Sequence, residues 1–203
     1  MNYVVCDIET AADETCLPLM EPPAPPANYK DPEKIAAWQA EAAQKQIGTM
    51  ALKASQCRIV ALGLDDAVMI APSVDAERSV LSAFWNFLSA GHGVVGFNFL
   101  AFDLPVIIVR SKMLRVPIPN FINYRKYGMD RIRDLMLELD PAGQGWQSLT
   151  WWCKRLALDV PDDPSTGADI AALVTNGDWD GVQKHCEIDL IKTRALLSYL
   201  DND

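Results

Sequence analysis

The chain lacks several features that mark specialised classes of protein. It has five cysteines among 203 residues, an odd number, and none of them forms a C-x-x-C pair. This usage argues against a disulfide framework or a zinc cluster, so we expect reduced cysteines that pack in the interior. No apolar run approaches the roughly 20 residues that a membrane-spanning helix needs. A basic and apolar leader is missing as well, so we expect a soluble, cytoplasmic protein that does not bind membranes.

Positive charge is also scarce. The formal net charge is −9, which speaks against a protein that coats nucleic acid through clustered lysines and arginines. Local charge matters more than the total, because cations gather between Arg110 and Arg133. Part of the negative charge would belong to a metal site, where bound ions offset it.

Length and hydrophobic pattern favour a single α/β domain over residues 1–203. Half of the residues are hydrophobic, and a chain of this length can bury one well-formed core. Strand patterns occur near 3–6, 57–64, 67–71 and 94–97, and helical patterns near 76–89, 131–139, 148–156 and 178–200. Residues 98–113 are expected to begin as a loop and become a helix, and residues 117–128 and 160–167 are expected to be irregular. We therefore predict a mixed central β-sheet flanked by helices.

An insertion of about residues 11–55 interrupts this pattern after the first strand. Its first half is rich in proline, and Asp31 followed by Pro32 is typical of the start of a helix over about 33–46. Because the insertion leaves the first strand directly after Glu9 and Thr10, it is either a flap beside a site or a decoration packed on the sheet.

The first acidic motif ends the first strand. The run from Tyr3 to Cys6 is apolar and β-prone, and it leads into Asp7 and Glu9. Residues two apart on a strand share a face, so the two carboxylates would lie side by side at the strand end. Two neighbouring anions repel unless one is protonated or a cation lies between them, so the pair predicts a divalent-metal site.

Two further acidic segments complete a pattern. Asp103 follows a strand and precedes a helix, at the kind of turn where sheet proteins place ligands. On the last predicted helix, His185 and Asp189 are four residues apart and therefore share a face.

Together these segments resemble the three motifs of the DEDD superfamily of 3′ to 5′ exonucleases, which has the ribonuclease H-like fold. The resemblance rests on D-I-E-T at residues 7–10, G-x-N-x-x-x-F-D at 96–103, and a proton acceptor four residues before an aspartate in the last helix. The exonuclease domains of B-family DNA polymerases and related stand-alone exonucleases are the most similar members. The resemblance implies a general-base role for His185 and two Mg²⁺ or Mn²⁺ ions on four carboxylates, those of Asp7, Glu9, Asp103 and Asp189.

The implied reaction releases nucleoside 5′-monophosphates from the 3′ end of single-stranded nucleic acid, with DNA favoured. In-line hydrolysis needs a hydroxide, a stabilised leaving oxygen and charge compensation on the phosphate, and two metal ions supply all three. A neutral imidazole can take the proton of the attacking water at physiological pH. We therefore expect the activity to have an acidic limb governed by His185.

One spacing departs from the family pattern, because members with histidine in the third motif usually carry it five residues before the aspartate, not four. Two alternatives stay open: an exonuclease of the same fold that trims RNA or oligonucleotides, and a non-catalytic module that binds nucleic acid. The sequence indicates no oligomeric state.

Three other residues are candidate substrate contacts, namely Thr10, Asn98 and Phe102. Trp146, Trp151 and Trp152 could stack on bases, although tryptophan in a helix more often packs in the core.

Overall fold

The computed structural model describes residues 3–120 and 131–201, and within them a five-stranded mixed sheet forms the centre of the molecule. The strand order is β3-β2-β1-β4-β5. The strands are β1 (Tyr3–Ala12), β2 (Cys57–Leu64), β3 (Ala67–Ile70), β4 (Gly93–Gly96) and β5 (Ile132–Asp134). β1, β2 and β3 pair antiparallel, whereas β4 and β5 run parallel to β1. The predicted α/β architecture with a mixed sheet is confirmed.

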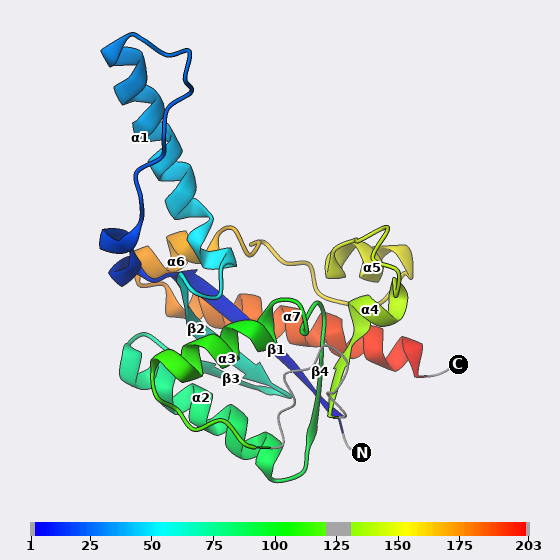
Figure 1. The fold of residues 1–203 in the computed structure, drawn as a ribbon. Coiled ribbons are helices and arrows are strands. Elements are labelled where there is room, and N and C mark those ends of the chain that lie inside the picture. Colours follow the sequence, from blue (N-terminus) through cyan, green and yellow to red (C-terminus); the bar gives the residue numbers. More distant parts are fainter. Residues whose placement is uncertain (1–2, 121–130, 202–203) are drawn as a thin grey trace.

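Helices cover both faces of the sheet (Figure 1). Helices α2 (Val74–Ser89) and α3 (Asp103–Met113) pack on one face, where Cys6 and Ile8 of β1 join the main hydrophobic core. Helix α7 (Trp179–Leu200) packs on the other face with Val5 and Ala11 of β1. Side chains alternate along a strand, so Asp7 and Glu9 share the α7 face with these two residues.

The helices mostly begin where local sequence predicts. Asp178 caps α7 by accepting a hydrogen bond from the amide of Gly181, and Ser148 caps α5 (Leu149–Arg155) in the same manner. Helix α2 begins at Val74, two residues before the predicted start near 76, because the Ser73 hydroxyl caps it by accepting a hydrogen bond from the amide of Ala76.

Two elements differ from the sequence prediction. Residues 131–139 form β5 followed by α4 (Leu135–Leu139), not one helix, because Ile132 pairs with Val94 along the edge of β4. A short helix, α6 (Ile170–Asn176), follows a loop at 160–167 that was predicted only as irregular chain. The predicted irregular segment 117–128 lies partly outside the described residues.

The insertion after β1 contains η1 (Glu14–Leu19), α1 (Pro32–Gly48) and η2 (Met50–Leu52). Asp31 caps α1 through the amide of Glu33, so the predicted start of this helix is confirmed. Helix α1 buries no side chain and projects away from the sheet (Figure 1). It is therefore not a decoration packed into the core.

The five cysteines are all buried and unpaired, as their spacing predicts. Over residues 3–120 and 131–201, the structure contains no helix with the length and apolar character needed to cross a bilayer.

Candidate functional site

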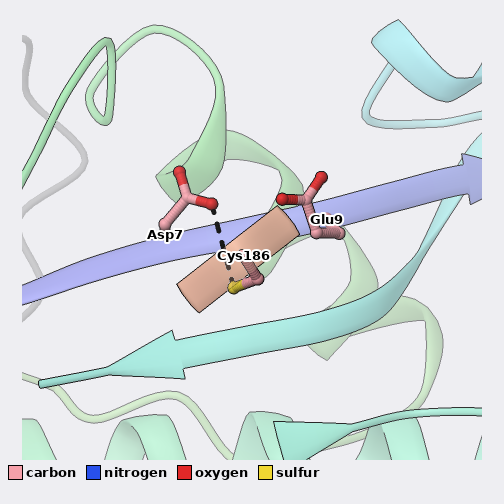
Figure 2. A group of neighbouring side chains, drawn as sticks. All are labelled: Asp7, Glu9 and Cys186. Atoms are coloured by element: carbon pink, nitrogen blue, oxygen red, sulfur yellow. Dashed lines mark hydrogen bonds between the residues drawn. The ribbon is translucent and has the colours of Figure 1, made fainter. Parts of the chain in front are cut away.

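Asp7 and Glu9 lie side by side on β1, and Figure 2 shows their carboxylates together with Cys186 of α7. The pair lies within the strand and not at its end, because β1 continues to Ala12 along its partner β2. On its other edge, β1 pairs with β4 only over Tyr3–Val5. The two carboxylates therefore lie just beyond the carboxyl end of this parallel pairing.

Asp103 is the first residue of α3, and it reaches back to β1. Its Oδ1 atom accepts a hydrogen bond of 3.1 Å from the amide of Ile8, the residue between Asp7 and Glu9. This bond fixes the third carboxylate against the first two, although the residues are almost a hundred positions apart in sequence.

The loop that leads into α3 is held by Asp134 of β5. The two carboxylate oxygens of Asp134 accept from the amides of Asn98 and Leu100, each at 2.9 Å. Gly96 makes the tight loop possible, because a Cβ atom there would lie 2.9 Å from the carbonyl oxygen of Cys6. Asn98 adopts a positive φ of 61° in this loop. Asp134 thus positions the segment that carries Asn98, and it also caps α4.

Helix α7 presents a polar stripe toward β1. His185, Asp189 and Lys192 occupy positions i, i+4 and i+7, so they lie on one helical face. The Nε2 atom of His185 is 3.7 Å from Oε1 of Glu9. The ammonium group of Lys192 is 2.8 Å from Oδ1 of Asp189.

One cavity of about 680 Å³ collects these residues. It is lined by all five residues predicted to carry the chemistry, namely Asp7, Glu9, Asp103, His185 and Asp189. Two of the predicted substrate contacts, Asn98 and Phe102, also line it. Thr10 is not part of this lining, and its hydroxyl donates to the carbonyl of Ala51 at 2.8 Å, so its side chain serves the insertion instead.

Burial and mutual repulsion raise the pKa values of three carboxyl groups in the cavity. Burial raises the pKa of Asp7 well above its ordinary value, and the charge of Asp189 adds to the effect. The pKa of Glu9 is raised by burial and then by Asp7 and Asp189, and that of Asp103 by burial and then by Asp7. The cluster therefore favours protons or a metal cation over four bare anions.

Cys186 is the nearest sulfur to this cluster. Its Sγ atom is 3.9 Å from Oδ2 of Asp7, and ligand atoms of Asp7, Glu9 and Cys186 lie within 4.8 Å of one another. Burial, followed by the charges of Asp7 and Glu9, raises the pKa of the thiol well above its ordinary value. A neutral thiol is a poor ligand, so the oxygen atoms are the better candidates for holding a metal ion.

Sequence reasoning missed several polar residues that line the cavity, among them Lys154, Asp163 and Lys192. Lys192 could have been found from its spacing, because it continues the helical stripe of His185 and Asp189. Nothing local marks Asp163, which lies in a loop rich in proline and aspartate.

Two arginines of the basic segment between Arg110 and Arg133 are held in ion pairs within the described residues. Arg110 is buried in ion pairs with Asp13 and Glu77, and Arg133 pairs with Glu138 and Asp201. The cavity takes its positive charge from Lys154 and Lys192 instead. The tryptophans at 146, 151 and 152 are not part of the cavity lining, although Trp152 packs on the hydrophobic cluster beside α7.

Comparison with known proteins identifies one family relationship. The chain is 32% identical over 152 residues to the uncharacterized protein MJ0365 of Methanocaldococcus jannaschii, an alignment that covers 70% of this chain and 82% of the archaeal protein. The chain belongs to the family of this archaeal protein. No established protein-family model matches it.

Membership of the MJ0365 family carries no activity with it, because the name of the archaeal relative states none. The function of this family member must therefore be argued from the chemistry of the cavity. The cavity is lined by a cluster of carboxylates, one imidazole and two lysines.

Proposed function

We propose that the chain is a divalent-metal-dependent exonuclease that removes nucleotides from the 3′ end of single-stranded nucleic acid. The observation that carries the proposal is the convergence of four carboxylates and one imidazole on one cavity. The five-stranded mixed sheet is compatible with the ribonuclease H-like fold of the DEDD exonucleases. DNA is the favoured substrate because the motifs resemble those of polymerase exonuclease domains.

The donor set fits hard divalent cations such as Mg²⁺ or Mn²⁺. The raised pKa values of Asp7, Glu9 and Asp103, which arise from burial and repulsion, mean that their ionised forms need a nearby positive charge. Carboxylate oxygens are the ligands that these cations prefer, and together with Asp189 the three residues would hold two ions. When bound, the ions would offset charge on the phosphate and lower the pKa of a coordinated water.

His185 supplies the general base. Its Nε2 atom faces Glu9 at 3.7 Å and accepts a proton from the attacking water. The water oxygen forms a bond to phosphorus as the bond from phosphorus to the 3′ oxygen breaks, and that oxygen takes a proton from solvent. The products are a nucleoside 5′-monophosphate and a strand shorter by one nucleotide.

The cavity walls suit a nucleotide at a strand end. Lys154 lies on the wall formed by α5 and is exposed, so its ammonium group can meet a backbone phosphate. Phe97 and Phe102 add apolar surface near the carboxylates, against which a base or sugar can pack. Asn98 adds a polar side chain whose buried Oδ1 atom has no protein hydrogen-bond partner.

The test is a cleavage assay on 5′-labelled single-stranded DNA and RNA with Mg²⁺, Mn²⁺ or EDTA. We expect a ladder that shortens from the 3′ end, depends on the metal and is faster on DNA. Asp7→Ala and Asp189→Ala should each lower the rate roughly 100-fold or more, because each removes a ligand worth several kcal/mol of transition-state stabilisation.

A matched control comes from α7 itself. Asp180 is an exposed acid in the first turn of the helix that carries Asp189, so Asp180→Ala should leave the rate unchanged. A faster reaction on RNA would make the protein an RNA-trimming exonuclease. Binding of both strands without cleavage would overturn the proposal and support a non-catalytic module.

A further inference from the structure

Asp163 lies in the loop between α5 and α6 and contacts two residues of α7. Its Oδ2 atom is 2.7 Å from Nδ1 of His185 and 3.5 Å from Nζ of Lys192. Its other oxygen, Oδ1, accepts hydrogen bonds from Ser165, at 3.0 Å from the amide and at 2.9 Å from the hydroxyl. The Ser165 hydroxyl also lies 3.2 Å from Nδ1 of His185, so that ring nitrogen faces both Asp163 and Ser165.

These contacts are shielded from water. The side chains of His185, Asp163 and Lys192 are 6%, 7% and 4% exposed. Asp163 spans the polar stripe of α7, because its two partners lie seven positions apart on the same helical face. A buried imidazole next to a carboxylate keeps the ring orientation that this contact sets.

We propose that Asp163 is a positioning residue that holds His185 in the Nδ1–H tautomer and turns its Nε2 lone pair toward the carboxylate cluster. An ionised carboxylate oxygen offers only lone pairs, so an unprotonated ring nitrogen 2.7 Å away would repel it, and a proton on Nδ1 removes this repulsion. In the neutral imidazole the opposite ring nitrogen is then unprotonated, and it is the one that faces Glu9. In the other tautomer, an N–H group would point into the cluster and could not accept a proton.

The environment of Asp163 keeps it an acceptor. Burial opposes ionisation, but the hydrogen bonds from Ser165, together with the charge of Lys192, hold the pKa of Asp163 below its ordinary value. The importance of the tautomer for catalysis rests on the function proposed above, whereas the tautomer itself is a property of the folded chain.

Asp163→Asn is a sharp test because Ser165 fixes how the amide would lie. The Ser165 amide can only donate, so the oxygen of the new side chain stays on it. The new NH₂ group then faces Nδ1 of His185, which must become the acceptor. We expect the His185 tautomer to invert, with the proton moving to Nε2.

The tautomer is read from long-range ¹H–¹⁵N spectra of the imidazole rings in the full, metal-free chain at slightly alkaline pH. The chain contains two histidines, and His92, which stacks on Phe87, is the internal reference. Ser165→Ala removes the hydroxyl that lies 3.2 Å from Nδ1 of His185, and it should keep the wild-type tautomer because the carboxylate of Asp163 still faces that nitrogen. An Nε2–H form in the wild-type protein would overturn the proposal even if no variant folds, as would an unchanged tautomer in a folded Asp163→Asn variant.

Kinetics on single-stranded DNA then separate positioning from other roles. Asp163→Asn should lower kcat about 100-fold, with KM and the half-maximal Mg²⁺ concentration within about threefold of wild type. The control Asp159→Asn removes an exposed charge of the same loop that does not line the cavity, and it should leave kcat within about twofold. A shifted Mg²⁺ requirement with an unchanged tautomer would show that Asp163 acts on the cation site instead, against the proposal. If the wild-type protein cleaves nothing, the exonuclease function fails, and the spectra alone decide the role of Asp163.

Discussion

At the scale of single residues, the cavity is defined by the kind of atom that each side chain offers. Three carboxyl groups with raised pKa values surround space that a hard cation can fill, while the raised pKa of the Cys186 thiol keeps it protonated. This difference makes Asp7 and Cys186 a useful pair, because they are 3.9 Å apart but offer different chemistry.

Cys186→Ser should therefore leave Mg²⁺-dependent cleavage within about threefold of wild type, because a neutral thiol contributes little to binding a hard cation. Asp7→Asn, which is similar in size to the native residue, should lower the rate roughly 100-fold or more. Rates are measured on the same 5′-labelled strand under saturating Mg²⁺. Equal losses in the two variants would mean that the sulfur is a ligand and that the oxygen cluster has been misassigned.

The five predicted catalytic residues line one cavity because the repeats of strand and helix put them on shared faces of their elements. Asp7 and Glu9 follow from the two-residue repeat of β1, and His185 and Asp189 from one turn of α7. Asp163 could not be predicted in this way. Its contact with His185 joins a loop to a helix, and only the packing of the chain brings the two together.

At the scale of secondary-structure elements, a buried ion cluster ties the helices to the sheet. Arg110 of α3 forms two hydrogen bonds to the carboxylate of Glu77 in α2, at 2.7 and 2.8 Å, and a third at 2.7 Å to Asp13 after β1. Glu77 also accepts from the amide of Ile59 in β2. Because α3 begins with Asp103, this cluster supports the third carboxylate from a distance.

Glu77→Gln should lower the free energy of unfolding by roughly 3 kcal/mol, because it leaves the buried Arg110 charge only partly compensated. The new NH₂ group would also face either Arg110 or the amide of Ile59, both of which are donors. Urea unfolding measures the loss as a lower midpoint with an unchanged slope. The exposed pair of Arg78 and Asp75 is the control, and Asp75→Asn should cause no measurable change. Similar losses in both variants would show that burial does not distinguish the two pairs.

The elements that sequence did not predict are short and depend on their neighbours. Strand β5 has three residues, too few for a period to appear, and it exists because the edge of β4 offers hydrogen bonds to it. Helix α6 ends at Gly177, a residue with a left-handed backbone conformation. The helix has seven residues, and among them Ile170 is the buried one. Longer elements such as β2 and α7 follow their sequence patterns closely.

At the scale of the whole molecule, strand order brings distant parts of the chain to one place. β1 lies at the centre of the sheet between β2 and β4, and Asp7 of this strand meets Asp103 and Asp189 from distant parts of the chain in one cavity. Folding thus gathers negative charge that a disordered chain would keep apart, and this costs stability that a bound cation would restore.

The pH dependence of stability follows from the sign of the pKa shifts. The folded protein holds protons on Asp7, Glu9 and Asp103 above the pH at which the unfolded chain releases them, near pH 4. Their contribution to the free energy of unfolding therefore falls as pH rises from about 4 through the raised values. Asp13 and Asp163, whose pKa values are lowered, act in the opposite direction, so the effect must be isolated by a variant.

Thermal unfolding of wild type and Asp7→Asn in EDTA isolates the contribution of the Asp7 carboxyl group to stability. The variant should be more stable than wild type at pH 8. Most of this difference should disappear at pH 5, where the raised pKa favours the protonated form of the native carboxyl group. Mg²⁺ should raise the Tm of wild type more at pH 8 than at pH 5, because binding requires ionised carboxylates. The same ion should leave the Tm of Asp7→Asn nearly unchanged. A Mg²⁺ effect that is independent of pH, or that persists in the variant, would place the cation elsewhere on the protein.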